Sequence, residues 1–224
     1  MGKRLDNIKK DIDANRIYPF AEALALVKKT ATIKFVGNLE LHLRLGIDPK
    51  KTDQIVRGTV TLPFGTGKKK RIIAFVNPAR EKEALEAGAI RAGGEEIIKE
   101  IKEKQVINFD IAIAEPSLMP KLAVIAKILG PKGLMPNPKT GTVTEDILKA
   151  IKEYSTGKLE FKNDQSGNIH IILGKINFEN DQLNANFKAF ADALSAAKPM
   201  GLKKEFIVSA YIHSTMGPSV KIKI

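Results

Sequence analysis

The chain of 224 residues contains no cysteine and no tryptophan. Without cysteine there is no disulfide, no thiolate nucleophile and no zinc site built on sulfur ligands. The sequence also lacks any run close to the roughly 20 apolar residues of a membrane-spanning helix. Its first residues contain no apolar segment typical of a signal peptide, so we expect a reducing, cytoplasmic compartment and no membrane partner.

Acidic residues are fewer than basic ones. Asp and Glu number 25 against 37 Lys and Arg, which gives a formal net charge of +12. Such an excess favours a polyanionic partner, whether RNA, DNA or an acidic protein. The densest basic run, at 68–71, is explained equally well by a solvated loop. Because 43% of the residues are hydrophobic, intrinsic disorder is excluded, and the length suffices for one large or two small domains.

Two kinds of hydrophobic pattern divide the chain. Near both ends of the chain, apolar and polar residues alternate. This pattern predicts strands with one buried and one solvent-exposed face, as in an antiparallel sheet covered by helices on one side. These strands are expected at 39–45, 56–62, 169–173 and 206–212, and helical spacing predicts helices at 5–12, 20–27 and 183–194.

The middle of the chain has a different pattern. Residues 72–76 and 111–114 are apolar nearly throughout, which is typical of strands buried on both faces of a parallel sheet. Helices are expected at 81–87, 95–104, 118–129 and from Glu145, where Thr142 and Glu145 fit a capping box and Gly157 lies near the end. We therefore predict a fold of the α+β and α/β classes with two domains. A discontinuous α+β domain contains 1–65 and 157–224, and a Rossmann-like α/β domain, 66–156, is inserted into it.

The sequence contains no complete motif for catalysis or cofactor binding. Gly65-Thr66-Gly67-Lys68 resembles the end of a phosphate-binding loop, but the required earlier glycine is Leu62 and Lys69 stands where a Ser or Thr is needed. Neither G-x-G-x-x-G nor G-x-S-x-G occurs. The three histidines, His42, His170 and His213, lie far apart in the sequence and have no metal-ligand spacing, so we interpret them as strand-surface or hydrogen-bonding residues and not as ligands. No cofactor and no metal are expected.

Two loops have an unusual composition. Residues 129–141 contain three prolines and three glycines around Leu134 and Met135. This pattern indicates a rigid long turn folded on its own domain, with a docking surface as the alternative. Residues 214–219 combine small and hydroxyl side chains with a methionine, which fits a plain hairpin loop or a site of close ligand approach.

Several segments together resemble the bacterial type of the L-one family of large-subunit ribosomal proteins. The resemblance runs in one order from about residue 16 to the C-terminus. It is carried by Leu45-Gly46-Ile47-Asp48-Pro49, Val56-Arg57-Gly58-Thr59-Val60, Ala87-Gly88-Ala89 with Gly93-Gly94-Glu95-Glu96, the loop at 129–138, Phe161-Lys162-Asn163-Asp164 with Gly167-Asn168-Ile169-His170, and Thr215-Met216-Gly217-Pro218-Ser219.

The resemblance implies the same discontinuous two-domain fold and a non-enzymatic protein, a monomer when free, that binds the 23S rRNA stalk near the tRNA exit site. It further implies assistance to the movement and release of deacylated exit-site tRNA and repression of translation of the protein's own mRNA. The family's RNA-contacting set maps onto Lys34, Phe35, Glu40, Ser209, Thr215, Met216 and Gly217. The chain departs from the family at Asn38, a position that usually carries a hydroxyl.

Each residue of this set has a distinct chemical role. Lys34 is expected to neutralise phosphate, and Phe35 to lie flat on a base or ribose. Glu40 repels phosphate, so at an RNA surface it makes sense only as an acceptor from base amino groups or a 2′-hydroxyl. The alternatives are a nucleotide-binding α/β enzyme, which nucleotide-induced stabilisation would indicate, and a general RNA chaperone, which would bind any RNA with similar affinity.

Overall fold

The structure is a computed structural model that describes residues 3–10, 12–14, 16–200, 202 and 205–224. The chain forms two compact units. The first unit contains Met1–Gly67 and Leu159–Ile224, and the second contains Lys68–Lys158. Each unit has its own sheets and its own hydrophobic core.

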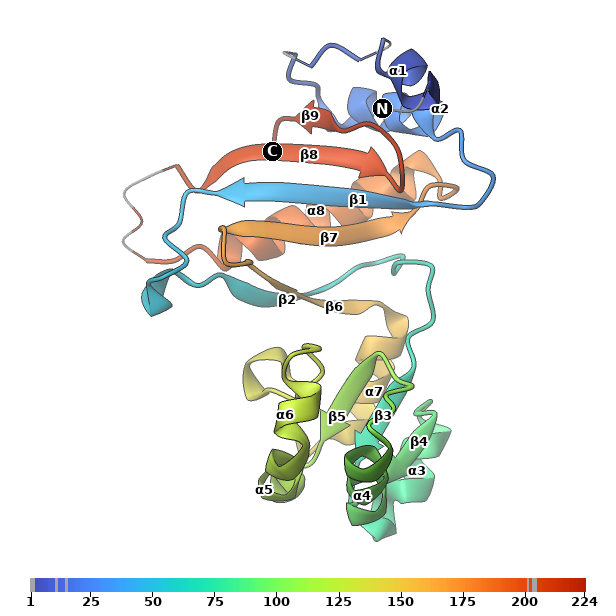
Figure 1. Cartoon of the computed structure of the whole chain (residues 1–224), viewed down its shortest axis with the longest axis vertical. Helices are drawn as coiled ribbons and strands as arrows, with labels where there is room; N and C mark the ends of the chain where they lie inside the picture. Colours follow the sequence, from blue (N-terminus) through green and yellow to red (C-terminus); the bar gives the residue numbers. More distant parts are fainter. Residues whose placement is uncertain (1–2, 11, 15, 201, 203–204) are drawn as a thin grey trace. The chain divides into compact units, whose positions relative to one another are not determined.

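A four-stranded antiparallel sheet forms the centre of the first unit (Figure 1). Its strand order is β7 (Asn168–Lys175), β1 (Asn38–Leu45), β8 (Ile207–Ser214) and β9 (Val220–Ile222). A separate two-stranded sheet joins β2 (Arg57–Thr61) and β6 (Lys158–Lys162). The alternating strands predicted near both ends of the chain are therefore confirmed.

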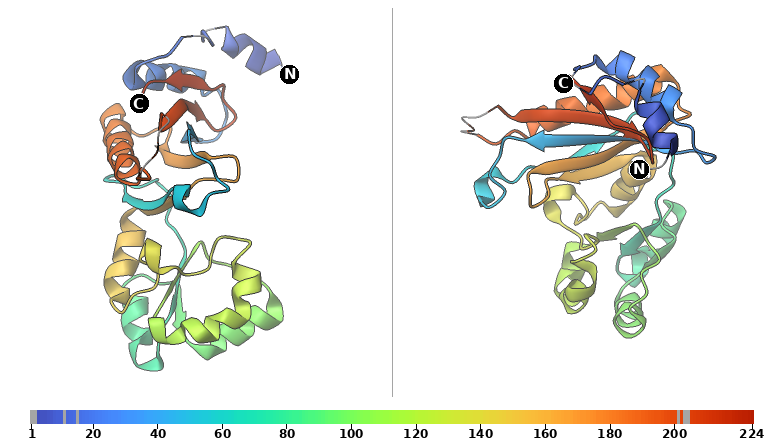
Figure 2. Two further views of the ribbon diagram at one scale, coloured as in Figure 1. Left: turned by 90° about the vertical axis from the view of Figure 1, so that its left-hand side faces the viewer. Right: turned by 45° about the horizontal axis from the view of Figure 1, so that its top comes forward.

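Helices cover one face of this sheet. The leucines of β1 point inward and pack against α2 (Phe20–Thr30) and the long α8 (Asn180–Ala196), which Figure 2 shows lying along the strands. A short α1 (Lys3–Lys9) and a 3-10 turn η1 (Thr52–Gln54) complete the unit. One position predicted to face inward is not buried. Val208 is 58% exposed, because the register of β8 against β1 shifts at this residue, between the pairs Arg44–Ser209 and Leu45–Ile207.

The second unit contains a three-stranded parallel sheet in the order β4 (Arg91–Gly93), β3 (Ile72–Phe75) and β5 (Ile111–Ala114). One face of β3 and β5 packs against α4 (Glu95–Lys104), α5 (Met119–Leu122) and α6 (Ala126–Leu129). The other face packs against α3 (Glu81–Glu86) and α7 (Ile147–Thr156). The prediction of strands buried on both faces is confirmed; β4 was not predicted, because three residues give no readable pattern.

Two predicted helix features of this unit are wrong. The helix expected at 118–129 is divided into the 3-10 turns η3 (Pro116–Leu118) and η4 (Ala123–Ile125) and the short α5 and α6. Pro120, in the first turn of α5, has no N–H with which to continue the turn before it, and this separates η3 from α5. The capping box is also absent. Asp146 caps α7 by accepting from the Lys149 N–H at 3.2 Å, whereas the Thr142 hydroxyl accepts from the Asn137 N–H at 2.7 Å.

The loop at 129–141 is a fixed turn, as predicted. Leu134 and Met135 pack against the core of their own unit. The turn η5 (Pro138–Thr140) is joined to α7 by the Tyr154 hydroxyl, which donates to the Thr140 carbonyl at 2.7 Å. The remaining 3-10 turn, η2 (Pro78–Arg80), precedes α3. None of the helices in the described part of the chain combines the length and the apolar character needed to cross a bilayer.

Candidate functional site

The face of the four-stranded sheet opposite the helices carries a row of polar side chains, which we call the exposed sheet face. Alternation along β1 turns Glu40, His42 and Arg44 outward while the leucines between them are buried. The strand register sets the neighbours of these three residues. On β8 they are His213, Tyr211 and Ser209, and on β7 they are Ile172, His170 and Asn168.

A hydrogen-bonded pair fixes one end of this face. The Thr215 hydroxyl donates to Glu40 Oε1 at 2.8 Å and accepts from the Asn38 N–H at 3.0 Å. The Thr215 N–H in turn donates to the Asn38 carbonyl at 3.0 Å. The Asn38 side chain is engaged elsewhere, because its amide oxygen accepts from Lys175 Nζ at 2.8 Å. The bond to Thr215 therefore holds the Glu40 carboxylate in one orientation. Its other oxygen, Oε2, faces His42 and His213.

The turn after β8 presents Met216 to solvent. Its φ of +61° lies in the left-handed region, which is uncommon for a residue other than glycine, and its side chain is 65% exposed. The Gly217 N–H donates to the Ser214 carbonyl at 2.7 Å. A Cβ atom at Gly217 would lie 2.2 Å from Ser214 Oγ, so a side chain at this position would displace the Ser214 hydroxyl.

The segment between α2 and β1 adds a second exposed apolar group. Phe35 and Val36 are 57% and 52% exposed, and Lys34 is also exposed. The following Gly37 is buried, and a Cβ atom there would lie 3.3 Å from the Cβ atom of Thr215. The end of this segment therefore packs against the start of the turn that carries Met216.

The predicted site residues thus fall into two groups. Six of them come from two chain segments that meet at one end of the exposed sheet face. The first segment carries Lys34, Phe35 and Glu40, and the second carries Thr215, Met216 and Gly217. Ser209 lies on the same face but opposite Arg44, six strand positions or roughly 20 Å from Thr215. Sequence reasoning missed Arg4, which donates from Nη2 to the Met216 carbonyl at 2.7 Å and from Nη1 to the Thr32 hydroxyl at 3.1 Å. No motif marks a single arginine of this kind.

The three histidines lie on the strand surface and make hydrogen-bonding contacts, as predicted, but their contacts are with one another, which was not predicted. His42 Nδ1 lies 2.6 Å from His170 Nδ1, and His42 Nε2 lies 2.6 Å from His213 Nε2. The separation in sequence hid this, because antiparallel pairing of β1 with both β7 and β8 brings distant positions together. Burial, together with the charges of His213 and His170, lowers the pKa of His42, and only the weaker attraction of Glu40 opposes this. We call these three residues the histidine cluster.

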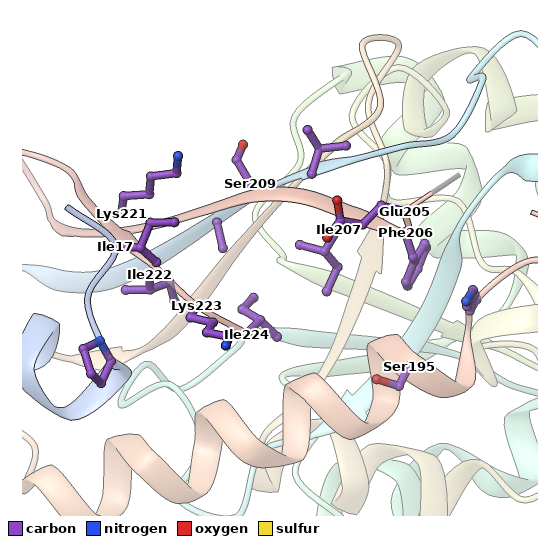
Figure 3. A pocket seen from close by; sticks show the side chains of 14 residues that line it. Ile17, Ser195, Glu205, Phe206, Ile207, Ser209, Lys221, Ile222, Lys223 and Ile224 are labelled. Carbon is purple, nitrogen blue, oxygen red and sulfur yellow. The ribbon is translucent and has the colours of Figure 1, made fainter. Parts of the chain in front are cut away.

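A groove of about 860 Å³ lies at the Ser209 end of the first unit. Residues of β8 and β9 line it together with Ile17, Ser195 and Lys198 (Figure 3). Lys221 and Lys223 add positive charge to its wall. Ser209 is among the lining residues, which separates it further from the Glu40 end of the sheet.

The carboxyl ends of the parallel strands in the second unit are occupied by internal contacts. Glu115 follows β5 and is buried, and it accepts hydrogen bonds from Arg80 Nη1 at 3.0 Å and Asn77 Nδ2 at 2.6 Å. This edge is where open α/β sheets bind nucleotides. Here its buried carboxylate is paired within the unit, so the geometry gives the nucleotide-binding alternative no support.

Comparisons with known proteins agree on one family. The model of the Ribosomal protein L1p/L10e family matches residues 27–218. The chain belongs to this family. A relative from Mycoplasma capricolum subsp. capricolum named "Large ribosomal subunit protein uL1" is 46% identical over 223 residues, which cover 100% of this chain and 98% of the relative. Proteins with the same name are 45% identical in Mesoplasma florum, with the same coverage, and 43% identical in Fervidobacterium nodosum, with 99% of this chain and 94% of the relative covered.

Family membership confirms the resemblance found in the sequence motifs. As a member of the L1p/L10e family, the chain is a structural protein of the large ribosomal subunit and not an enzyme, and it is located on the ribosome in the cytoplasm. Its mixed α and β architecture is consistent with that family.

Proposed function

We propose that this protein binds the rRNA stalk of the large subunit, near the tRNA exit site, through the Glu40 end of the exposed sheet face. One observation carries the proposal. Phe35 and Met216, each more than half exposed, lie beside a carboxylate and a hydroxyl that hold each other in place. Exposed apolar groups next to fixed hydrogen-bonding groups suit irregular RNA, whose unstacked bases need both.

The residues at the Glu40 end of the exposed sheet face contact different parts of the RNA. Lys34 supplies charge to phosphate, which contributes affinity for any RNA. Phe35 and Met216 contact bases or riboses, and Gly217 lets the backbone approach closely. Glu40 keeps accepting capacity beyond its bond to Thr215, because a carboxylate has about four acceptor sites. We assign it the reading of base amino groups or a 2′-hydroxyl, and Ser209 a second, outlying contact to ribose or phosphate.

The same surface accounts for two further roles that we propose, repression of translation and assistance to tRNA release. A messenger RNA that imitates the rRNA site would occupy the Glu40 end of the sheet, so binding to the protein's own mRNA would exclude rRNA and repress translation. When rRNA occupies this surface, the protein moves with the stalk and assists the movement and release of deacylated exit-site tRNA. We further propose that the two compact units are independent domains and that the free protein is a monomer.

The sign of the Glu40→Gln effect tests the proposal. Removing a negative charge strengthens binding to RNA if charge alone matters. If Glu40 is an acceptor, the variant instead binds stalk RNA about 10- to 150-fold more weakly, since a hydrogen bond to a charged group is worth roughly 1.5–3 kcal/mol. Affinities for stalk RNA and for a random duplex are measured at two salt concentrations, in the presence of a chelator.

Three further variants complete the experiment. Met216→Ala weakens stalk binding and leaves the salt dependence nearly unchanged, whereas Lys34→Ala weakens both RNAs and reduces the salt dependence by about one phosphate contact. Asp192→Asn removes a negative charge from α8, on the other side of the sheet, and serves as the matched control. Tighter stalk binding by Glu40→Gln contradicts the acceptor role, and equal affinity of the wild type for both RNAs favours the general RNA chaperone.

A further inference from the structure

The histidine cluster forms a chain of contacts that ends on an oxygen at each side. Asp164 Oδ2 lies 3.5 Å from His170 Nε2, and His170 then meets His42 through their Nδ1 atoms. His42 meets His213 through their Nε2 atoms, and His213 Nδ1 lies 2.9 Å from the Ser214 carbonyl. All six imidazole nitrogens of the protein take part in this chain, because it has three histidines in total.

Counting protons shows that neutral histidines cannot satisfy these contacts. Each of the two oxygens requires a proton on the nitrogen that faces it, and each of the two nitrogen pairs requires one shared proton. Four protons are needed, whereas three neutral imidazoles carry three. One pair of nitrogens is then left with its lone pairs face to face at 2.6 Å, a repulsion that a cation bound between them relieves.

A metal ion at the His42–His213 pair resolves the count. His42 then keeps its proton on Nδ1 and donates to His170, His170 donates from Nε2 to Asp164, and His213 donates from Nδ1 to the Ser214 carbonyl. Every imidazole is neutral and every contact is satisfied. Metal-binding histidines usually donate their second N–H to a carbonyl or carboxylate in this way.

The third donor is in place. Glu40 Oε2 lies 3.8 Å from His42 Nε2 and 3.9 Å from His213 Nε2, and its other oxygen is fixed by Thr215. Ligands of a tetrahedral zinc ion, each 2.0–2.1 Å from the metal, are separated by about 3.4 Å. The carboxylate already has nearly this spacing, and the two imidazoles reach it by opening roughly 0.8 Å. The three side chains are 23–29% exposed, which leaves a fourth position open to solvent.

We propose that Glu40, His42 and His213 bind one divalent transition-metal ion of the zinc type, with His170 as a positioning residue that orients His42. The ligand set of two imidazoles and one carboxylate selects zinc or its neighbours over magnesium and calcium, which prefer oxygen ligands alone. The bound ion connects β1 to β8 at the Glu40 end of the exposed sheet face.

The chain allows a clean test, because without cysteine or further histidines no other site offers this kind of ligand. Untagged, chelator-treated full-length protein is titrated with Zn²⁺ and with Mg²⁺ by calorimetry, followed by thermal unfolding. We expect one Zn²⁺ per chain and a higher melting temperature with Zn²⁺ but not with Mg²⁺. His42→Gln and His213→Gln lower the Zn²⁺ affinity by more than about 100-fold, and His170→Gln by about 10- to 100-fold, as for an outer partner. Asp192→Asn, on α8, leaves it unchanged.

A second measurement on the wild type keeps the test decisive if a variant fails to fold. The three histidines give three sets of imidazole NMR signals, and Zn²⁺ shifts all three at one equivalent while Mg²⁺ shifts none. The proposal is overturned if Zn²⁺ does not bind, if binding survives in folded His42→Gln and His213→Gln, or if the imidazole signals do not respond. These outcomes are independent of RNA affinity, which is measured with the metal removed.

Discussion

Asp110 shows how a single surface carboxylate contributes to stability in a pH-dependent way. Both of its oxygens accept from the Arg71 guanidinium at 3.2 Å, and Oδ2 also accepts from the Arg71 N–H at 3.0 Å. These bonds lower the pKa of Asp110 to about 2. As the pH falls, the unfolded chain therefore takes up this proton first. The stabilisation is complete above about pH 4 and is lost as the pH falls toward 2.

Asp110→Asn should consequently reduce the free energy of unfolding by about 1 kcal/mol at pH 7, a modest value because the Arg71 side chain is half exposed and screened by water. The difference from the wild type should shrink steadily between pH 4 and pH 2.5, as measured by urea unfolding. Arg71→Gln removes the same pair from the other side and should show the same pH dependence. A difference that stays constant down to pH 2.5 would contradict the assignment.

At the scale of elements, Asn186 joins three parts of the first unit. It is fully buried in α8, where its Nδ2 donates to the Gly65 carbonyl at 2.9 Å and to the Leu173 carbonyl of β7 at 2.7 Å, while Oδ1 accepts from the Phe64 N–H at 3.1 Å. Asn186→Ala leaves three backbone groups without a partner. Since each such group costs about 1–3 kcal/mol when buried, we expect a loss of 3 kcal/mol or more by chemical denaturation.

A matched control separates this effect from helix propensity. Asn184→Ala changes the same residue type in the same helix at a partly exposed position, and it should alter the stability by less than about 0.5 kcal/mol. If the two variants are equally stable, the hydrogen bonds of Asn186 are not what joins α8 to its neighbours.

Elements could be predicted from the sequence wherever periodicity is long enough to be read. The alternation of Leu39 to Leu45 and the apolar run at 72–76 each identified a strand and its burial, β1 and β3. β4 was missed because three residues show no period. The division of the helix predicted at 118–129 was missed because its buried residues, Leu118, Leu122, Ile125 and Leu129, keep helical spacing throughout. The capping of α7 by Asp146 was missed because Thr142 offered an equally good pattern.

The candidate site was predictable only in part, and for a geometric reason. The family resemblance named Glu40 and Thr215 as candidate RNA-binding residues, and the structure joins these two by a hydrogen bond. The histidine cluster was not predictable, because it depends on the register of β1 against two strands that lie more than 100 residues away in the sequence. Register is set by the packing of the whole sheet on its helices, and no local pattern reports it.

At the scale of the whole molecule, the chain leaves the first unit after Gly67 and returns to it at Leu159, so one compact unit is inserted within the sequence of the other. The first unit contains every residue assigned to RNA binding and all three histidines. Its core includes residues from both ends of the chain but none from 68–158. The first unit should therefore fold when the second is replaced by a linker.

Replacing residues 68–157 with a flexible Gly/Ser linker of about eight residues, which spans roughly 15 Å, tests this expectation. The shortened protein should unfold cooperatively, because the core of the first unit is intact, and should keep most of its affinity for stalk RNA. Binding is compared with the full-length protein at two salt concentrations, and Asn186→Ala in the shortened protein reports whether α8 is docked as in the whole chain. A protein that is folded by this measure but does not bind stalk RNA would move the binding site to the second unit, whereas failure to fold would show that the first unit depends on the second for its stability.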